Sequence, residues 1–327
     1  MFKTAVTETY GTRLPVIAGG LMWLADAHYV AACAKAGIVS FITAASFPEL
    51  EDLRAEIRKA RSLCGDLPFG VNVSMLPKLV QGEKTRDVFQ LIADEGVKFV
   101  ETSGRNPEEF MAIMKPAGIH VLHKVPAVRY AVKAQFIGAD MVAIVGVECG
   151  GHPGMDMIGT IVNAAMAERD LTIPFVIGGG IGTGSQVVAA LAMGASGVIM
   201  GTRLLVAQEI ATHENIKRKM VEASERDTAL TLSSLRNTIR TLRNETTDAV
   251  LKLEKEKPDI TIADLMHLVS GKIGREAYRT GDWSKGLLSA GHALAFADRI
   301  EPMSAIMARI AAEAETALNR LTSATQH

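Results

Sequence analysis

The stretch PFVIGGGIGTGSQVVAALAMGASGVIMGTR, residues 174–203, carries the same local pattern twice. An apolar run leads into glycines, an amphipathic segment follows and ends at Gly194, and a second apolar run leads into a second glycine turn. A continuous apolar run is typical of a parallel strand covered on both faces, and glycine commonly ends a helix. The stretch therefore predicts two parallel strands joined by a helix, each strand followed by a glycine-rich turn.

The same alternation extends through the first 200 residues. Eight apolar runs are predicted to be strands: Pro15–Ala18, Ile38–Thr43, Phe69–Ser74, Lys98–Thr102, His120–Lys124, Met141–Val145, Phe175–Ile177 and Gly197–Met200. Seven amphipathic segments are predicted to be helices: Ala25–Ala36, Glu49–Leu63, Arg86–Glu95, Pro107–Ala117, Val128–Ile137, Thr160–Arg169 and Gly184–Met193. Eight strands, with glycine turns after the last two, favour an α/β fold of the (β/α)8 TIM-barrel type over a doubly wound open sheet.

The pattern changes after Gln208. From there to the end the sequence reads as almost wholly helical, with no convincing strand. We expect a barrel domain over residues 1–210 and a smaller helical subdomain over residues 211–301 that serves as substrate or lid domain. The amphipathic stretch Pro302–Leu321 is a candidate for the eighth barrel helix, displaced to the C-terminus.

Composition excludes several classes of partner. The 35 Lys and Arg residues balance 36 Asp and Glu, so charge gives no reason to expect nucleic acid or a membrane surface. Three distant cysteines form no disulfide framework, which suits a reducing compartment. No signal peptide or membrane span is read, and we expect a cytoplasmic protein. A homodimer is left open.

The two glycine turns suggest a phosphate site. Glycine lets backbone N–H groups approach a phosphate, and a helix starting near Gly184 adds its positive end. The run GGGIGTG at 178–184 fits neither the dinucleotide fingerprint nor a P-loop, which needs a lysine. A mononucleotide such as FMN is the predicted ligand; the alternative is a pair of tight turns with no ligand.

Polar side chains near other strand ends are candidates for chemistry. His152, in GVECGGHPGMD at 146–156, could act as a general base or hydrogen-bond donor, or be a solvated loop residue. Lys124 and Asn72 end the fifth and third strands and could contact a flavin, although an ion pair with a helix carboxylate explains Lys124 equally well. The turn Gly19–Trp23, with Gly20, Leu21 and Met22, offers amides and an apolar wall to a flavin ring.

The remaining histidines and cysteines look structural. His28 and His123 are expected in the core or at strand ends, and no histidines have metal-ligand spacing with a carboxylate, so no metal site is predicted. Cys149 is interpreted as a small buried loop residue rather than a nucleophile.

Taken together, these motifs resemble the FMN-dependent nitronate monooxygenases, formerly called 2-nitropropane dioxygenases, whose relatives include NADH:quinone reductases and flavin enoyl-reductases. The resemblance implies a TIM barrel carrying FMN, with a smaller helical domain covering the active site. It assigns His152 as the catalytic residue. It assigns FMN contacts to Asn72, Lys124, Gly151, Gly179, Gly180, Gly201 and Thr202. Two positions depart from the pattern: Met22 replaces a common Gln, and Val145 replaces an Asp typical of the quinone reductases.

Three functions follow as hypotheses, each with a small-molecule substrate. The first is oxidation of alkyl nitronates with O2 to a carbonyl compound and nitrite. The second is NAD(P)H:quinone reduction at the same FMN site, with Pro77–Lys84 as a lid. If their segment is helical, Arg236, Arg240 and Arg243 could share one face and bind a pyrophosphate, although a solvated basic helix face explains them equally well. The third is a non-catalytic barrel that binds a phosphate ligand.

Overall fold

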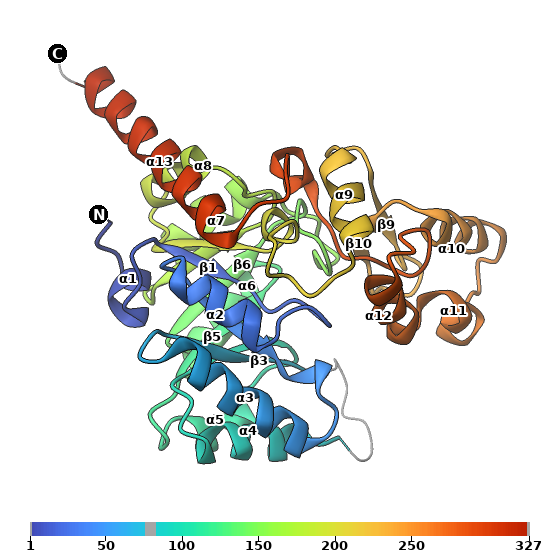
Figure 1. Cartoon of the computed structure of the whole chain (residues 1–327), viewed down its shortest axis with the longest axis horizontal. Helices are drawn as coiled ribbons and strands as arrows, with labels where there is room; N and C mark the ends of the chain where they lie inside the picture. The colour runs from blue at the N-terminus through green and yellow to red at the C-terminus, as the bar shows by residue number, and fades with distance from the viewer. Residues whose placement is uncertain (1, 76–82, 326–327) are drawn as a thin grey trace.

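A closed parallel barrel forms the body of the protein, seen in a computed structural model that describes residues 2–75 and 83–325 (Figure 1). Its strands follow one another in chain order: β1 (Val16–Ala18), β2 (Val39–Thr43), β3 (Gly70–Met75), β4 (Phe99–Gly104), β5 (His120–Val125), β6 (Met141–Val145), β7 (Phe175–Gly178) and β8 (Gly197–Met200). Pairing of β1 with β8, Val16 opposite Val198, closes the ring. The predicted barrel is confirmed.

Helices surround this barrel, as the alternating sequence predicts. They are α2 (Ala27–Lys35), α3 (Leu50–Cys64), α4 (Thr85–Asp94), α5 (Met111–Met114), α6 (Val128–Phe136), α7 (Thr160–Asp170) and α8 (Gly184–Ala192), while α1 (Ala5–Tyr10) precedes β1. The expected helix Pro107–Ala117 is shorter than predicted: a 3₁₀ turn over Glu108–Phe110 leads into the four-residue α5. Pro116 has no N–H to donate, so the helix does not continue through it.

The C-terminal helix α13 (Met303–Thr325) lies beside α8 and also packs on α2 (Figure 1). The Gly184 N–H, at the start of α8, donates to Glu313 Oε2 at 2.8 Å. A Cβ on Gly184 would lie only 2.1 Å from the Ile310 carbonyl oxygen. Glycine is therefore required here because the backbones of α8 and α13 are in direct contact.

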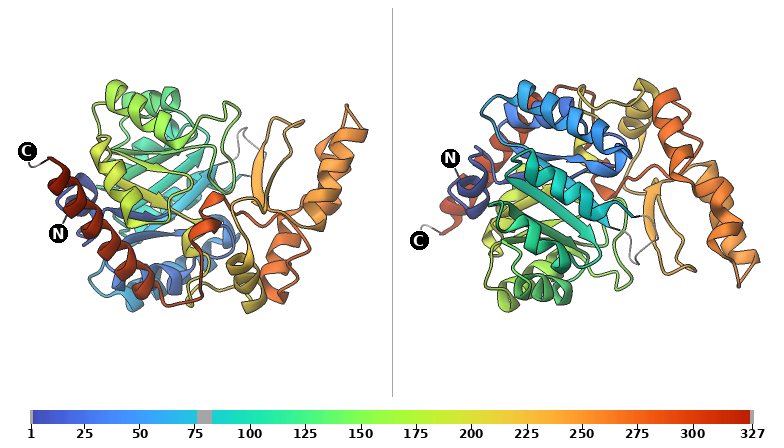
Figure 2. Two further views of the ribbon diagram at one scale, coloured as in Figure 1. Left: turned by 90° about the horizontal axis from the view of Figure 1, so that it is seen from above. Right: turned by 90° about the horizontal axis from the view of Figure 1, so that it is seen from below.

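A second layer lies to one side of the barrel (Figure 2). It contains α9 (Glu214–Glu222), α10 (Glu245–Glu256), α11 (Ile262–Val269), α12 (Gly271–Thr280) and an antiparallel hairpin of β9 (Thr228–Thr231) and β10 (Ile239–Leu242). The expectation of no strand after Gln208 was wrong. Buried polar residues, Arg240 and Thr241, occupy β10 and hide the apolar pattern of a strand. The division at residues 210 and 301 stays a prediction.

None of the helices in the described part of the chain is both long and apolar enough to cross a membrane.

Replacing Gly184 by alanine is expected to lower the free energy of unfolding by about 1–3 kcal/mol, the usual cost of overpacking. The added methyl group would force α13 away from α8. Urea denaturation measures the change. Gly274→Ala in α12 is the matched control, since its nearest new neighbour is the Leu287 carbonyl oxygen at 3.8 Å. Equal stability of Gly184→Ala and the wild type would contradict the close contact.

Candidate functional site

A buried carboxylate organises the mouth of the barrel. Glu101, in β4, is fully buried and its Oε2 accepts hydrogen bonds from the Gly20 N–H and from Asn72 Nδ2, both at 2.9 Å. Its Oε1 lies 2.6 Å from Lys124 Nζ. Three donors on three different segments therefore converge on one side chain. The structure thus brings together the predicted site residues Gly20, Asn72 and Lys124.

The sequence interpretation missed Glu101. The alternative considered for Lys124 was an ion pair with a carboxylate on a helix. Lys124 does form an ion pair, but its partner Glu101 lies on the neighbouring strand β4 and not on a helix. The available signal was a carboxylate inside an apolar run that was itself predicted to be a buried strand. A charge in that position needs compensating partners, and finding it would have linked Lys124 to Asn72.

The contacts around Glu101 leave little room at the carboxyl end of β1. A Cβ on Gly20 would lie 2.6 Å from both Cβ and Cγ of Asn72. The absence of a side chain lets the turn after β1 approach β3 closely enough for the Gly20 N–H to reach Glu101. The neighbouring Leu21 is half-buried, and Met22 is 44% exposed.

The two glycine turns after β7 and β8 lie side by side, since these strands are paired. Gly179 and Gly180 have φ values of +108° and +69°, which favour glycine. A Cβ on Gly201 would meet only Leu21 Cδ2, at 3.6 Å. Within the described part of the chain, no protein acceptor takes the backbone N–H groups of Gly180, Gly201 or Thr202. Backbone N–H groups that lack a protein acceptor, in a turn with no side chain in the way, are suited to binding a phosphate group.

Side chains behind the turns hold them in place. The Thr160 hydroxyl lies 2.7 Å from Glu148 Oε2 and 3.0 Å from the carbonyl oxygens of Gly178 and Gly179. The Thr202 hydroxyl accepts the Gly291 N–H at 2.9 Å. The backbone donors of the turns therefore do not depend on a ligand for their arrangement.

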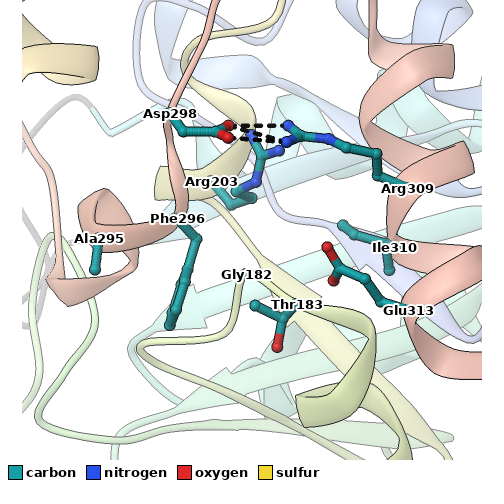
Figure 3. A pocket seen from close by; sticks show the side chains of 9 residues that line it. All are labelled: Gly182, Thr183, Arg203, Ala295, Phe296, Asp298, Arg309, Ile310 and Glu313. Atoms are coloured by element: carbon teal, nitrogen blue, oxygen red, sulfur yellow. Dashed lines mark hydrogen bonds and ion pairs between the residues drawn. The ribbon is translucent and has the colours of Figure 1, made fainter. Parts of the chain in front are cut away.

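A charged cluster supports the second turn from outside the barrel (Figure 3). Arg203 is 2% exposed and lies 3.4 Å from Glu301, and Arg309 contacts both Asp298 and Glu301. Burial, with the neighbouring Arg309 charge, lowers the pKa of the Arg203 guanidinium. Arg203, Asp298 and Arg309 line a cavity of about 190 Å³ together with Thr183. The cluster connects the turn after β8 to the segment that leads into α13.

The loop that follows β6, at the carboxyl ends of the barrel strands, carries His152. Its backbone is fixed by Glu148, whose carboxylate accepts the Thr160 N–H, and by a bridge between Gly151 and Arg240. His152 retains solvent exposure at the rim, but the surrounding protein desolvates the imidazolium and lowers its pKa. The neutral imidazole, which can accept a proton, is therefore favoured at neutral pH.

Arg240 connects the second layer to this loop. Its N–H donates to the Gly151 carbonyl at 2.7 Å, and its side chain donates to the Val147 carbonyl at 3.2 Å and to Thr228 Oγ1 at 3.0 Å. The prediction that Arg236, Arg240 and Arg243 share a helical face was wrong. Arg240 lies buried in β10, Arg236 lies in the hairpin turn, and Arg243 pairs with Asp248. Arg240 positions the loop, because its Nε and Nη1 both donate to oxygens of the protein.

Other residues singled out in the sequence lie apart from this arrangement. His123 is buried in β5 against Thr102, as predicted, whereas His28 is exposed on α2, so its predicted burial was wrong. Burial raises the pKa of the Cys149 thiol to about 12, which suits a structural residue. Of the predicted lid Pro77–Lys84, residues 77–82 lie outside the described residues.

The fold defines a class, the closed β/α barrels, and the candidate site lies at the carboxyl ends of the strands. A family model for nitronate monooxygenase matches residues 3–313. The chain belongs to this family of flavin-dependent oxidoreductases, as the sequence motifs predicted.

Solved structures and curated relatives agree with that assignment. FabK from Thermotoga maritima is 29% identical, with a TM-score of 0.90 over 99% of both chains. Nitroalkane oxidase from Streptomyces ansochromogenes is 25% identical, with a TM-score of 0.82 over 97% of this chain and all of the other.

A curated relative from Rhodococcus jostii is named (3aS,4S,5R,7aS)-5-hydroxy-7a-methyl-1-oxo-octahydro-1H-indene-4-carboxyl-CoA dehydrogenase. It is 32% identical over 70% of this chain, and the match spans 62% of that relative's length.

Removing Lys124 is expected to destabilise the fold by about 3–5 kcal/mol, because the fully buried Glu101 carboxylate loses its counter-charge. Removing Glu101 should cost less, because the Lys124 side chain keeps 23% of its surface exposed. Glu101→Gln and Lys124→Met, alone and together, form a double-mutant cycle measured by urea denaturation. We expect the double variant to be more stable than the sum of the single losses by at least about 1 kcal/mol. Strictly additive losses would show that the two side chains do not interact.

Proposed function

We propose that this barrel binds FMN and oxidises alkyl nitronates with O2 to a carbonyl compound and nitrite. The proposal is carried by the loop after β6, which bears the proton acceptor His152, is bridged to Arg240, and leaves the barrel at the same strand ends as Gly20, Asn72 and Lys124. FMN, when bound, would supply the electron acceptor for the substrate and the route of electrons to O2.

The residues present fit the FMN phosphate. The free N–H groups of Gly180, Gly201 and Thr202 would bind it, since a monoanion or dianion gains most from several backbone donors at once. Gly179 is part of the same turn and allows its backbone to curve around the ligand.

The flavin ring would lie between the turn Gly20–Met22 and the polar ends of β3 and β5. Asn72 and Lys124 would donate to it, and Gly151 would bring the catalytic loop over it without a side chain. Glu101 fixes the direction of the Lys124 amino group, so this donor is oriented before any ligand arrives.

His152 would take the proton from the carbon next to the nitro group of a neutral nitroalkane. Its lowered pKa keeps the imidazole unprotonated and ready to accept. A preformed nitronate has already lost this proton, so it needs His152 only for binding and orientation.

His152→Asn is expected to lower kcat/KM for a neutral nitroalkane by about 10²–10⁴-fold, the usual value of a general base, and to affect the nitronate much less. In the wild type, the pH profile for the nitroalkane should fall only below the ordinary histidine pKa of about 6.5, because the folded protein lowers that pKa. Initial rates with both substrates across pH measure this. Equal small losses on both substrates would remove His152 from proton transfer.

Gly201→Ala is expected to weaken FMN binding by about tenfold to a hundredfold, the value of one or two charge-assisted hydrogen bonds. The new Cβ has only Leu21 as a protein neighbour, so it should intrude on the ligand and leave the stability of the apoprotein unchanged. Titration of apoprotein with FMN measures affinity, and thermal denaturation of the apoprotein is the control. Unchanged affinity would place the phosphate elsewhere.

A second candidate function is reduction of the flavin by NAD(P)H, with a quinone as acceptor. It is favoured by a cavity lined by cations beside the Gly20–Met22 turn, described below. Anaerobic mixing with NADH, NADPH or a nitronate separates the candidates, because only a true reductant bleaches the flavin absorbance. The third hypothesis, a non-catalytic barrel, does not hold, since the family and its neighbours are oxidoreductases.

A further inference from the structure

A cavity of about 520 Å³ opens between the turn after β1 and helix α12 of the second layer. Trp23 and Ala211 line it on the barrel side, and Lys272, Arg275 and Arg279 line it on the side of α12. Its volume is within the range of small-molecule and cofactor sites. None of the functions assigned so far to His152 or to the glycine turns uses this space.

The cavity is positively charged although the chain as a whole has a net charge of −1. Arg279 is neutralised by Glu276 at 2.5 Å, but neither Lys272 nor Arg275 has a carboxylate within ion-pair distance among the described residues. Both are exposed and lie one helical turn apart on α12. Two unpaired cations at this spacing suit a ligand with two adjacent negative charges, such as a diphosphate.

Trp23 gives the cavity an aromatic wall held in an unusual conformation. Its φ of +68° is rare for a bulky residue, and its backbone N–H donates to Ser46 Oγ at 2.9 Å. Such backbone strain is maintained where the surrounding structure enforces it, and it clusters at ligand sites. The Arg275 guanidinium lies 5.2 Å from the centre of the Trp23 ring. An indole beside a guanidinium offers stacking surfaces for a planar base.

We propose that this cavity binds the adenosine diphosphate portion of a nucleotide-bearing substrate. The adenine would stack on the Trp23–Arg275 pair, and the diphosphate would bind Lys272 and Arg275. NADH, NADPH and coenzyme A share this portion, so the chemistry of the site is common to all three.

The location connects the cavity to the candidate active site. Trp23 follows directly on the turn Gly20–Met22 that is proposed to flank the flavin. A ligand anchored at the rim by its diphosphate could therefore extend its reactive end toward the mouth of the barrel. In its NADH and NADPH forms the inference rests on the second candidate function, whereas nitronate oxidation needs no nucleotide.

Isothermal titration of the FMN-loaded protein with ADP tests the site directly. We expect ADP to bind the wild type in low salt and to lose affinity as salt is added. The double variant Lys272→Ala with Arg275→Ala should bind ADP at least about tenfold more weakly. Lys252→Ala, which removes an exposed cation on α10, is the matched control and should bind ADP like the wild type. Inorganic pyrophosphate should bind more weakly than ADP, because it lacks the adenine. Competition of NADH, NADPH and coenzyme A against ADP identifies the natural ligand.

Absence of ADP binding overturns the proposal, and so does equal binding by the double variant and the wild type. Pyrophosphate binding as tight as ADP binding also overturns it, since the aromatic wall would then play no part. If only the second candidate function is wrong, the result is distinguishable. ADP then still binds with an affinity that depends on Lys272 and Arg275, but neither NADH nor NADPH bleaches the flavin. Conversely, flavin reduction by NADH with an unchanged KM in the double variant would keep that function and reject NADH as the ligand of this site.

Discussion

The buried charge of Glu101 is the constraint on which the mouth of this barrel depends. A carboxylate taken out of water costs several kcal/mol unless donors surround it. Strand β4 lies between β3 and β5, and the register places Asn72 directly beside Glu101. Lys124 reaches it from the other neighbour, and Gly20 reaches it with a backbone N–H. Satisfying one charge thus determines where three candidate ligand-binding groups lie.

Backbone hydrogen bonds, as well as side-chain contacts, connect the second layer to the loop after β6. Arg240 in β10 exchanges two backbone hydrogen bonds with Gly151, next to His152. Its guanidinium also donates to Val147, at the start of the same loop. A proton acceptor must be held within a fraction of an ångström to be effective, and this bridge supplies that rigidity. The smaller layer therefore has a role in positioning the loop of the candidate catalytic histidine.

One mouth of this kind is compatible with more than one electron donor. In the proposed function the glycine turns and the Glu101 cluster would contact only the flavin, so they would serve a nitronate or a nicotinamide equally well. Discrimination between donors would come from the rim, where His152 and the residues of α12 differ in chemistry. This division suits a chain that is similar both to a solved nitroalkane oxidase and, in sequence, to a curated CoA dehydrogenase.

By itself the sequence determined the barrel, its strand boundaries to within a residue or two, and the glycine turns, because these depend on local apolar periodicity and on backbone freedom at glycine. Only the tertiary structure decided the partners of Lys124, the hairpin of β9 and β10, and the position of Arg240. Each of these depends on groups far apart in the chain. Glu101 reads as an ordinary charged residue until β3 and β5 lie beside it, and the buried Arg240 of β10 finds an acceptor in Val147 of a barrel loop. Local periodicity reports which residues avoid water, but it does not report which distant polar group satisfies a buried one.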